Sequence, residues 1–336
     1  MADRGDEANL RSAVAAGDAE ARPALGQLLF LQSHSEASRL EGMQLLTDAA
    51  HDGHGGAAHF LALITGGNTE LEDNWVYALA YLGRAADAGH GLAQRQLAFL
   101  AGEPDIAQRI IGGEEFLSET WHRLHDAIDV AALIAPPPLR VISVTPYVAI
   151  VEGLATPAAC DWIVERARPE LAPAKIYNPE GGGTAGLTRS NSEMRFAAPE
   201  LDLVLLFLRQ RIAVLTGLGV DSMETTAVLH YAVGQEFKPH YDFLNPAVPA
   251  YAAEIAEFGQ RLATVLIYLN DDFDGGETDF LRLGRRYKGK KGDAVIFHNV
   301  DKTGAPDLAT LHAGRATTRG EKWLLSQWLR GTKLPL

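Results

Sequence analysis

The stretch LHYAVGQEFKPHYD, residues 229–242, decides the fold of the second half of this 336-residue chain. It ends in His240-Tyr241-Asp242. On an extended strand, residues i and i+2 point to the same face, so the imidazole of His240 and the carboxylate of Asp242 would converge. The pattern His-x-Asp alone is a weak signal. It indicates a metal site only where a second histidine arrives from elsewhere in the chain.

Few histidines can complete that site. Residues 136–336 contain four, at positions 230, 240, 298 and 312. His298 follows a predicted strand and is the rival of His312, whereas His230 is interpreted as a packed strand residue. His312 is preferred because Lys322 follows it by ten residues. A buried lysine beside a metal is costly unless it meets an anion, and a dicarboxylate such as 2-oxoglutarate supplies one. Two histidines and a carboxylate leave positions on Fe(II) for this cosubstrate and O₂.

Short β-rich stretches, separated by Gly, Pro, Asn and Asp, make up most of the second half. Many short strands with turn signals between them indicate a sandwich or barrel. Two helices, Pro157–Ala167 and Pro199–Thr216, interrupt the strands, and Lys288–Lys291 is predicted to be a turn. The predicted strands are Val141–Val144, Tyr147–Val151, Thr226–Tyr231, Leu262–Leu269, Ala294–Phe297 and Trp323–Trp328.

Five sequence blocks follow one another in this half, and their order is more specific than any one of them. They are Leu229-His230-Tyr231 to Asp242, Arg261 to Tyr268-Leu269, Gly275-Gly276-Glu277-Thr278, Lys291-Gly292-Asp293-Ala294, and Leu311-His312 to Gly320-Glu321-Lys322-Trp323. From about Val141 to Leu329 the chain resembles the prolyl 4-hydroxylase branch of the Fe(II)/2-oxoglutarate dioxygenases. The resemblance implies a double-stranded β-helix, or jelly roll, in agreement with the predicted strands.

The resemblance also implies roles for residues around the metal and the cosubstrate. His240, Asp242 and His312 would ligate Fe(II). Lys322 would pair with the C5 carboxylate of 2-oxoglutarate, assisted by the hydroxyl of Thr278. Tyr231, nine residues before the first ligand, stands where the family's cosubstrate-contacting tyrosine lies.

Substrate-side residues follow from the same resemblance. Arg261 and Trp328 match positions that line the substrate groove. Arg189-Ser190-Asn191, after the glycines at 181–183, resembles a mobile loop that folds over substrate. Phe237 stands where the peptide hydroxylases often carry a tyrosine. This departure removes a hydroxyl group near the substrate.

The expected reaction is hydroxylation of a C–H bond, with 2-oxoglutarate converted to succinate and CO₂ and with ascorbate in support. Asp242 favours hydroxylation, because related halogenating enzymes carry a small residue at this position. The resemblance indicates a prolyl residue of a peptide or protein as substrate. A free amino acid or a peptide natural product is the alternative. A repeat-based binding module without catalytic activity is the alternative from another class.

The first hundred residues repeat at an interval of 36. Leu10, Leu46 and Leu82 align, and the near-identical pair AAHDGH (49–54) and AADAGH (85–90) follows. Each unit is predicted to be two short helices, the first ended by a glycine, at Gly17, Gly53 and Gly89. Such units stack into a solenoid. Residues 8–102 resemble the Sel-like repeats, relatives of the tetratricopeptide repeats, which implies a protein-binding surface. The remaining alternative is a stabilising appendage, and the repeat histidines His51, His54 and His90 are interpreted as architecture.

A helix over residues 114–134 is predicted to cap the solenoid, with apolar spacing at Phe116, Trp121, Leu124, Ile128 and Ala132. Pro136-Pro137-Pro138 cannot continue a helix and is interpreted as a linker. We therefore expect an α+β multidomain chain, with an all-α repeat domain at 1–135 and a dioxygenase domain at 136–336.

Charge is unevenly distributed. Residues 1–135 carry 20 acidic and 8 basic residues, whereas the rest of the chain is almost neutral. The acidic half argues against nucleic acid as partner and fits a basic protein or peptide, or simply a solvated surface. No apolar run reaches the ~18 residues of a membrane span, and the acidic start MADRGDEANL is unlike a signal peptide. A single cysteine, Cys160, is expected to be a buried filler and favours a reducing cytoplasm.

Overall fold

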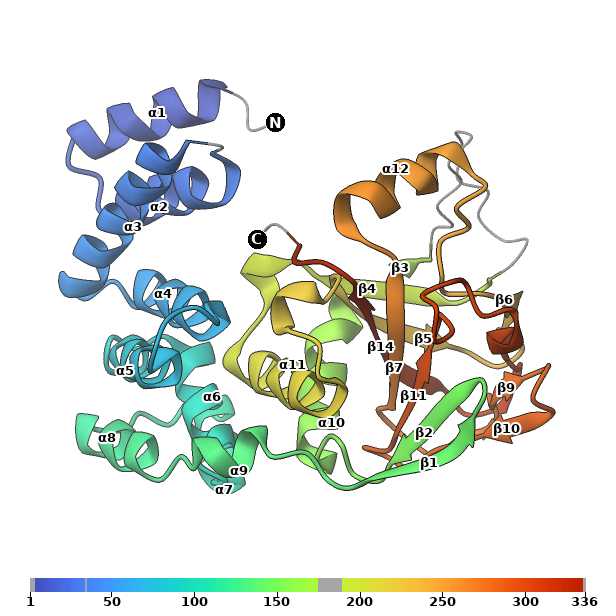
Figure 1. The fold of residues 1–336 in the computed structure, drawn as a ribbon. Helices are drawn as coiled ribbons and strands as arrows, with labels where there is room; N and C mark the ends of the chain where they lie inside the picture. Colours follow the sequence, from blue (N-terminus) through green and yellow to red (C-terminus); the bar gives the residue numbers. More distant parts are fainter. Residues whose placement is uncertain (1–3, 34, 175–188, 335–336) are drawn as a thin grey trace. The chain divides into compact units, whose positions relative to one another are not determined.

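The protein, described here from a computed structural model, forms two compact units (Figure 1). The structure describes residues 4–33, 35–174 and 189–334. The first unit comprises the chain up to Leu133 together with Leu201–Phe207, and the second comprises Ile134–Glu200 and the chain from Leu208 onward. Along the sequence the first change of unit comes beside the predicted linker at 136–138. The glycines at 181–183, which the sequence links to a mobile loop, lie outside the described residues.

The first unit is helical, as the sequence predicts. Among the described residues no helix is long and apolar enough to cross a membrane. The helices that begin in this part of the chain are α1 (Arg4–Ala15), α2 (Ala21–Gln32), α3 (Glu36–His51), α4 (Gly55–Gly67), α5 (Asn74–Asp87), α6 (Gly91–Leu100), α7 (Pro104–Ile111), α8 (Ser118–Asp126) and α9 (Val130–Ile134).

Helices α1 to α6 form three successive pairs that follow the 36-residue period. The glycine after the first helix of each pair adopts a left-handed backbone, with φ of 84° at Gly17, 90° at Gly53 and 79° at Gly89. Only glycine adopts this conformation without strain, which explains its recurrence. The equivalent leucines Leu25, Leu61 and Leu97 are almost fully buried. The assignment to the Sel-like repeats in particular stays a prediction.

Two of the repeat histidines begin helices. The Nδ1 atom of His54 accepts a hydrogen bond from the backbone N–H of Ala57, at 3.0 Å, at the start of α4. His90 accepts in the same way from Ala93, at 3.2 Å, at the start of α6. The first amide groups of a helix have no partner within it, so a neutral imidazole serves here as an N-terminal cap. These contacts are the architectural role expected of the two side chains.

The predicted single helix at 114–134 is wrong. The chain forms α8 and α9 instead, separated at residues 127–129. At the end of α8 the amide of Ala127 is shared between the carbonyls of Arg123 and Leu124. The carboxylate of Asp129 then accepts from the amide of Ala132 and starts a new helix. The apolar spacing could not reveal this break, because it continues across both helices.

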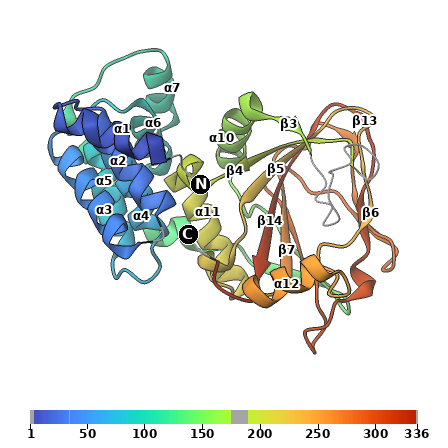
Figure 2. The same ribbon diagram turned by 90° about the horizontal axis from the view of Figure 1, so that it is seen from above.

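The second unit is a β-sandwich (Figures 1 and 2). Within the described part of the chain, its main sheet has eight strands in the order β1-β2-β11-β7-β14-β5-β4-β3, and the smaller sheet has four in the order β10-β9-β12-β6. Strands β8 and β13 form a separate pair. The strands are β1 (Leu139–Val144), β2 (Tyr147–Val151), β3 (Ala172–Pro173), β4 (Ser192–Phe196), β5 (Thr226–Tyr231), β6 (Phe237–His240), β7 (Arg261–Tyr268), β8 (Asp274–Gly275), β9 (Thr278–Phe280), β10 (Arg285–Tyr287), β11 (Ala294–His298), β12 (His312–Gly314), β13 (Thr317–Arg319) and β14 (Lys322–Arg330).

The helices of this half are α10 (Pro157–Ala167), α11 (Leu203–Thr216) and α12 (Pro249–Phe258). Helix α10 packs on the outer face of the main sheet, where the guanidinium of Arg166 lies over the ring of Phe196. Cys160 of α10 is buried, and burial raises the pKa of its thiol to about 12. A thiol in that state is not nucleophilic, which agrees with its predicted role as a filler.

The two sheets pack face to face around aromatic residues. Phe280 of the smaller sheet contacts Phe297 of the main sheet edge to face, with ring centroids 5.2 Å apart. Tyr268 and Leu324 of the main sheet belong to the same buried cluster. This arrangement of an eight-stranded and a four-stranded antiparallel sheet confirms the predicted jelly roll. Because residues alternate along each strand, every second residue of β4, β5, β7 and β14 points between the sheets.

Candidate active site

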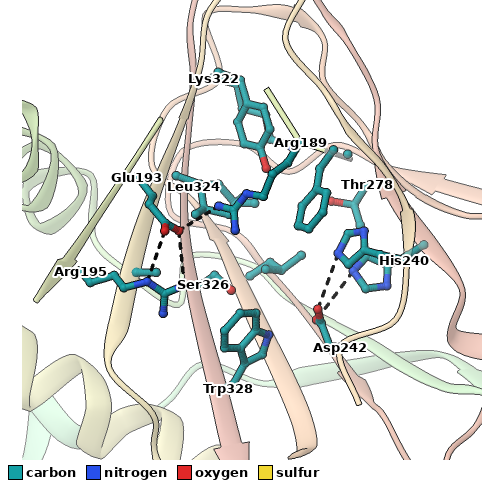
Figure 3. A pocket seen from close by; sticks show the side chains of 17 residues that line it. Arg189, Glu193, Arg195, His240, Asp242, Thr278, Lys322, Leu324, Ser326 and Trp328 are labelled. Carbon is teal, nitrogen blue, oxygen red and sulfur yellow. Dashed lines mark hydrogen bonds and ion pairs between the residues drawn. The ribbon is translucent and has the colours of Figure 1, made fainter. Parts of the chain in front are cut away.

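Two histidines and an aspartate converge between the sheets (Figure 3). His240 ends β6, and His312, directly opposite it on the neighbouring strand, begins β12. The Nε2 atom of His240 lies 3.6 Å from Oδ1 of Asp242, and that of His312 lies 3.7 Å from Oδ2. One donor atom from each residue lies within 4.8 Å of the others, and among the described residues this is the one cluster of such side chains.

Hydrogen bonds outside the cluster orient all three side chains. The Nδ1 of His240 lies 2.8 Å from the carbonyl of Lys238, and that of His312 lies 3.0 Å from the carbonyl of Thr310. A carbonyl accepts only, so each Nδ1 carries a proton, and Nε2 is the nitrogen that faces the centre. Thr264 donates to Oδ2 of Asp242 at 2.8 Å. Asn299 in turn donates to the hydroxyl of Thr264, at 2.9 Å.

The electrostatics of the cluster suit a cation. Burial, with the neighbouring His312, lowers the pKa of His240 to about 3, so its imidazole is neutral. Burial alone would raise the pKa of Asp242, but the two histidines and Thr264 lower it below its ordinary value. Two neutral imidazoles and one carboxylate are the donor set of non-haem Fe(II) sites with open positions. The residues present therefore fit this metal.

One detail of the predicted geometry is wrong. His240 and Asp242 were expected to share one face of an extended strand, but β6 ends at His240. Asp242 lies in the irregular segment beyond it, where Thr264 holds its carboxylate and Arg261 contacts its carbonyl at 3.3 Å. The two side chains therefore meet through these tertiary contacts and not through the strand period.

The two other histidines of this half lie apart from the cluster. His298, the rival of His312, is exposed at the end of β11 and stacks on Tyr147, with ring centroids 4.2 Å apart. His230 of β5 packs against the ring of Trp323, as expected of a packed strand residue.

Lys322 lies in the same pocket as the three residues of the cluster. Its side chain is buried with 1% of its surface exposed, and Nζ donates to the carbonyl of Gly276 at 2.7 Å. Among the described residues no carboxylate forms a salt bridge with it. Burial lowers the pKa of Lys322 to about 7, with Glu277 acting weakly in the opposite direction. An ammonium in this position is stabilised by an anion that enters the pocket.

The other predicted cosubstrate residues surround Lys322. Tyr231 lies opposite Lys322 on the paired strand, with Nζ 5.1 Å from its ring centroid. Thr278 is buried and hydrogen-bonds to the hydroxyl of Tyr268, at 2.9 Å. That Tyr268 hydroxyl donates to the carbonyl of Tyr287 at 2.8 Å, so the proton of the Thr278–Tyr268 bond comes from Thr278. Tyr268 stands in one of the five sequence blocks but was given no role there, although it faces the pocket side of β7.

Three of the predicted substrate residues line the pocket: Arg189, Phe237 and Trp328. Phe237 stacks on the imidazole of His240, with ring centroids 3.5 Å apart. The guanidinium of Arg189 lies 4.9 Å from the centroid of the Phe237 ring. Phe237 thus packs against a candidate metal ligand and presents an apolar surface where a tyrosine would have presented a hydroxyl.

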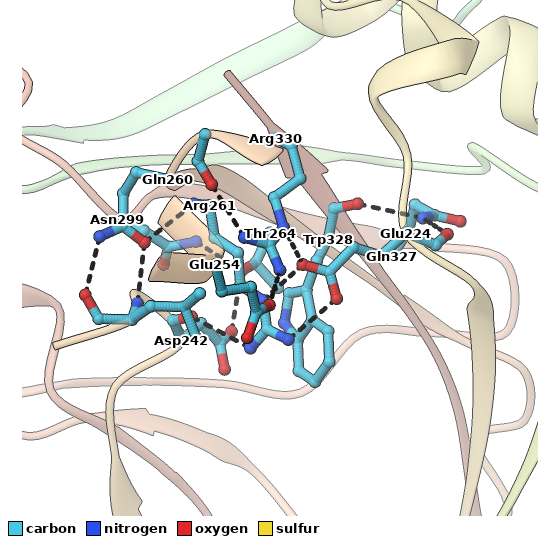
Figure 4. Close-up of polar contacts among 12 residues, drawn as sticks. Glu224, Asp242, Glu254, Gln260, Arg261, Thr264, Asn299, Gln327, Trp328 and Arg330 are labelled. Carbon is cyan, nitrogen blue, oxygen red and sulfur yellow. Dashed lines mark hydrogen bonds and ion pairs between the residues drawn. The ribbon is translucent and has the colours of Figure 1, made fainter. Parts of the chain in front are cut away.

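Arg261 does not line the pocket but lies against the ring of Trp328, which does (Figure 4). Its guanidinium forms two hydrogen bonds with Glu224, at 2.6 and 2.9 Å, and lies 3.6 Å from the centroid of the Trp328 ring. Glu224 also accepts from Arg330 at 2.5 Å. Arg261 therefore supports Trp328 and the Asp242 segment, because its hydrogen-bonding groups are already engaged.

Sequence reasoning missed residues that only the folded sheet brings to the pocket. They are Glu193, Arg195, Ala227, Leu229, Leu266, Gly314, Leu324 and Ser326, with Thr264 and Asn299 behind Asp242. One signal was available. In β4 the charged Glu193 and Arg195 alternate with the buried Met194 and Phe196, the period of a strand with two different faces.

Comparison with known proteins decides the family. Residues 226–330 match the family described as the 2OG-Fe(II) oxygenase superfamily. Probable prolyl 4-hydroxylase 9 of Arabidopsis thaliana is 30% identical over 236 residues, which cover 65% of this chain and 79% of the plant protein. The chain belongs to this superfamily, and its relatives there are prolyl 4-hydroxylases.

Other relatives match a smaller part. The rat prolyl 4-hydroxylase subunit alpha-1 is 33% identical over 172 residues, or 51% of this chain and 32% of that subunit. Among solved structures, the viral collagen prolyl hydroxylase of Paramecium bursaria Chlorella virus-1, as a 2OG complex, is 25% identical with a TM-score of 0.44. That match covers 57% of this chain and 99% of the viral chain.

Membership of the 2OG-Fe(II) oxygenases confirms the predicted enzyme class and cofactors. The chain is a 2-oxoglutarate-dependent dioxygenase that uses Fe(II), 2-oxoglutarate and O₂. The matched residues include the three side chains of the cluster and Lys322, which the fold collects in one pocket.

Proposed function

We propose that this dioxygenase hydroxylates a prolyl residue of a peptide or protein, and that 2-oxoglutarate is converted to succinate and CO₂. The observation that carries the proposal is a single pocket. It contains the cluster of His240, Asp242 and His312 together with Lys322, whose buried ammonium is suited to bind an anion. The prolyl 4-hydroxylases among its relatives support the choice of a prolyl substrate.

Each residue of the cluster has a part in this proposal. His240 and His312 would hold Fe(II) by Nε2 and Asp242 by a carboxylate oxygen. When bound, Fe(II) supplies the activation of O₂. Lys322 would bind the far carboxylate of 2-oxoglutarate, with Tyr231 and Thr278 beside it. Asp242 fills a position that a halogenating enzyme would leave to chloride, which favours hydroxylation.

The remaining pocket residues would orient the substrate and exclude water. Leu229, Leu266 and Leu324 form an apolar floor, and Phe237 and Trp328 add aromatic walls. A prolyl ring has few polar atoms, so it gains by burial against such surfaces. Phe237 stacks on His240, with ring centroids 3.5 Å apart, so a prolyl ring packed against Phe237 would lie close to the metal.

The test of this proposal uses the full chain with Fe(II), ascorbate, 2-oxoglutarate and a panel of proline-containing peptides. We expect succinate release that depends on peptide, and a gain of one oxygen atom on proline by mass spectrometry. Succinate release that depends instead on free amino acids would favour the alternative substrate class. If no substrate stimulates turnover while Fe(II) and 2-oxoglutarate still bind, the peptide hydroxylase proposal is wrong.

We also propose that the acidic helical unit recruits a basic region of a protein substrate. Its support is the charge of residues 1–135, with 20 acidic and 8 basic side chains. Neutralising three exposed carboxylates (Asp48→Asn, Glu72→Gln and Glu115→Gln) is then expected to raise the KM for a protein substrate severalfold while a short peptide is unaffected. Added salt should act in the same direction. Equal KM values for the protein substrate at low and high salt, and in both forms of the enzyme, would count against recruitment by charge.

A further inference from the structure

Two charged residues of β4, Glu193 and Arg195, face the pocket (Figure 3). The residues that alternate with them, Met194 and Phe196, are buried on the other face of the strand. Neither charged residue belongs to the metal cluster or to the surroundings of Lys322. Charged side chains in a pocket need partners, so their contacts indicate what the pocket is able to bind.

The two arginines beside Glu193 are held to very different degrees. The side chain of Arg189 is 6% exposed and donates to Glu193 at 2.9 Å and to Asn191 at 3.0 Å. Arg195 is 39% exposed, and both of its contacts with Glu193 measure 3.4 Å. The hydrogen bond between Glu193 and Arg189 is therefore the stronger one. The contacts of Arg195 with Glu193 are weak, so its guanidinium can bind another anion instead.

Counted over the residues that the structure describes, the charges in this part of the pocket do not balance. Two guanidinium groups, of Arg189 and Arg195, meet the single carboxylate of Glu193. The nearby guanidinium of Arg261 is already paired with Glu224. Asp242 lies on the other side of the pocket with the two histidines. One positive charge thus remains beside Trp328, whose ring centroid lies 5.7 Å from the guanidinium of Arg195.

The pocket residues next to Arg195 on the main sheet have small side chains. In the sheet, Arg195 lies opposite Ala227, and Ala227 lies opposite Ser326 of β14. The adjacent row, by contrast, runs from Glu193 through Leu229 to Leu324, with larger side chains. All of these residues line the pocket. Small side chains in the Arg195 row leave space for a short acidic group of a bound molecule.

We propose that Arg195, with Glu193 as its resting partner, forms a subsite for a carboxylate of the substrate next to the hydroxylated residue. The inference rests on the proposed peptide hydroxylation and names a substrate class within it: prolyl residues beside an acidic side chain or beside the carboxylate end of a chain. A carboxylate gains a charge-assisted hydrogen bond there, flanked by Trp328 and partly shielded from water. An amide of the same shape gains less, and a lysine is repelled.

The test compares short peptides with one proline, blocked at both ends, that carry Asp, Asn or Lys immediately before or after it. A further pair ends in proline with either a free carboxylate or an amide, which separates the two sources of the acidic group. For the unmodified enzyme we expect kcat/KM to be about tenfold higher for the favoured acidic peptide than for its amide, mainly through KM.

Three variants make the test specific to this subsite. Arg195→Gln should reduce the acid-to-amide ratio to near one, and Arg195→Glu should favour the Lys peptide. Glu193→Gln should increase the preference for acid, because it leaves two guanidinium groups unneutralised. The matched control is Arg140→Gln, an exposed arginine of β1 outside the pocket, which should keep the ratio of the unmodified enzyme.

The outcomes separate the inference from the function on which it rests. Hydroxylation of Asp and Asn peptides with equal kcat/KM, or a preference for acid that persists in Arg195→Gln and Arg195→Glu, would overturn the subsite and leave the hydroxylase intact. If none of the peptides is hydroxylated, the proposed function fails and the inference falls with it. A change in ratio without a change in the KM for 2-oxoglutarate is the expected signature of a substrate subsite.

Discussion

Replacing Asp242 by alanine is expected to lower kcat for substrate hydroxylation by roughly a thousandfold or more, since several kcal/mol of metal-dependent catalysis depends on this ligand. Asp242 is 5% exposed and, among the described residues, is the one carboxylate in contact with both His240 and His312. Without it the two imidazoles are left with no carboxylate beside them, and the Thr264 hydroxyl loses its acceptor. Affinity for Fe(II) should fall together with turnover. The measurements are succinate release and titration with Fe(II) under nitrogen.

A pair of histidine variants is the matched control for this result. His312→Ala should resemble Asp242→Ala, because His312 supplies a donor atom to the cluster. His298→Ala should keep metal affinity and turnover close to those of the unmodified enzyme, since that side chain is exposed and stacks on Tyr147. Equal losses in the two histidine variants would contradict the assignment of the ligands, and so would full activity of Asp242→Ala.

Lys322→Met is expected to raise the KM for 2-oxoglutarate roughly a hundredfold, the equivalent of about 3 kcal/mol for a charge-assisted contact. Its effect on Fe(II) affinity should be small. Without cosubstrate the same variant should be at least as stable as the unmodified protein, because it removes a buried ammonium that has a single carbonyl partner. The measurements are steady-state kinetics, Fe(II) titration and thermal unfolding with and without 2-oxoglutarate.

The depressed pKa of Lys322 adds a pH dependence with a definite sign. Below about 7 the ammonium is already protonated in the empty pocket, and above it the lysine must take up a proton before it pairs with a carboxylate. Affinity for 2-oxoglutarate should therefore weaken as pH rises above about 7, by up to about tenfold per unit. In Lys322→Met this dependence should be absent. The exposed Lys302→Met is the control, and the role of Lys322 would be wrong if both variants changed the KM equally.

Much of this fold could be predicted because local signals and tertiary structure agree. The bounds of Tyr147–Val151, Thr226–Tyr231 and Pro157–Ala167 in the structure are those expected. Each combines a clear apolar pattern with turn residues or a proline at its start, so local preference already specifies the element. Lys322 follows His312 by ten residues, and this interval led to the choice of His312 as the partner of His240. Strands β12 and β14 place His312 and Lys322 in the same pocket as His240.

The parts that could not be predicted depend on contacts between distant segments. Asp242 lies outside its strand because Thr264, 22 residues away, holds it. Arg261 was expected to line the substrate groove. Its guanidinium instead forms hydrogen bonds with Glu224 and packs against the ring of Trp328. Strand β4 was missed because it has only five residues and its charged members face a pocket instead of solvent. The alternation within β4 indicates a strand with two different faces, but no pattern within one segment says that the charged face lines a pocket.

Strand β14 carries Lys322 at one end and Trp328 six residues later, with Leu324 and Ser326 between them on the same face. At about 3.3 Å per residue, the strand sets a span of roughly 20 Å between the cosubstrate anchor and the substrate wall. Exchange of a side chain keeps this register, whereas one residue inserted between Lys322 and Trp328 would turn Trp328 away from the pocket. Point substitutions at Ser326 or Trp328 would therefore reshape the substrate end of the pocket and leave Lys322 in its place at the other end of the strand.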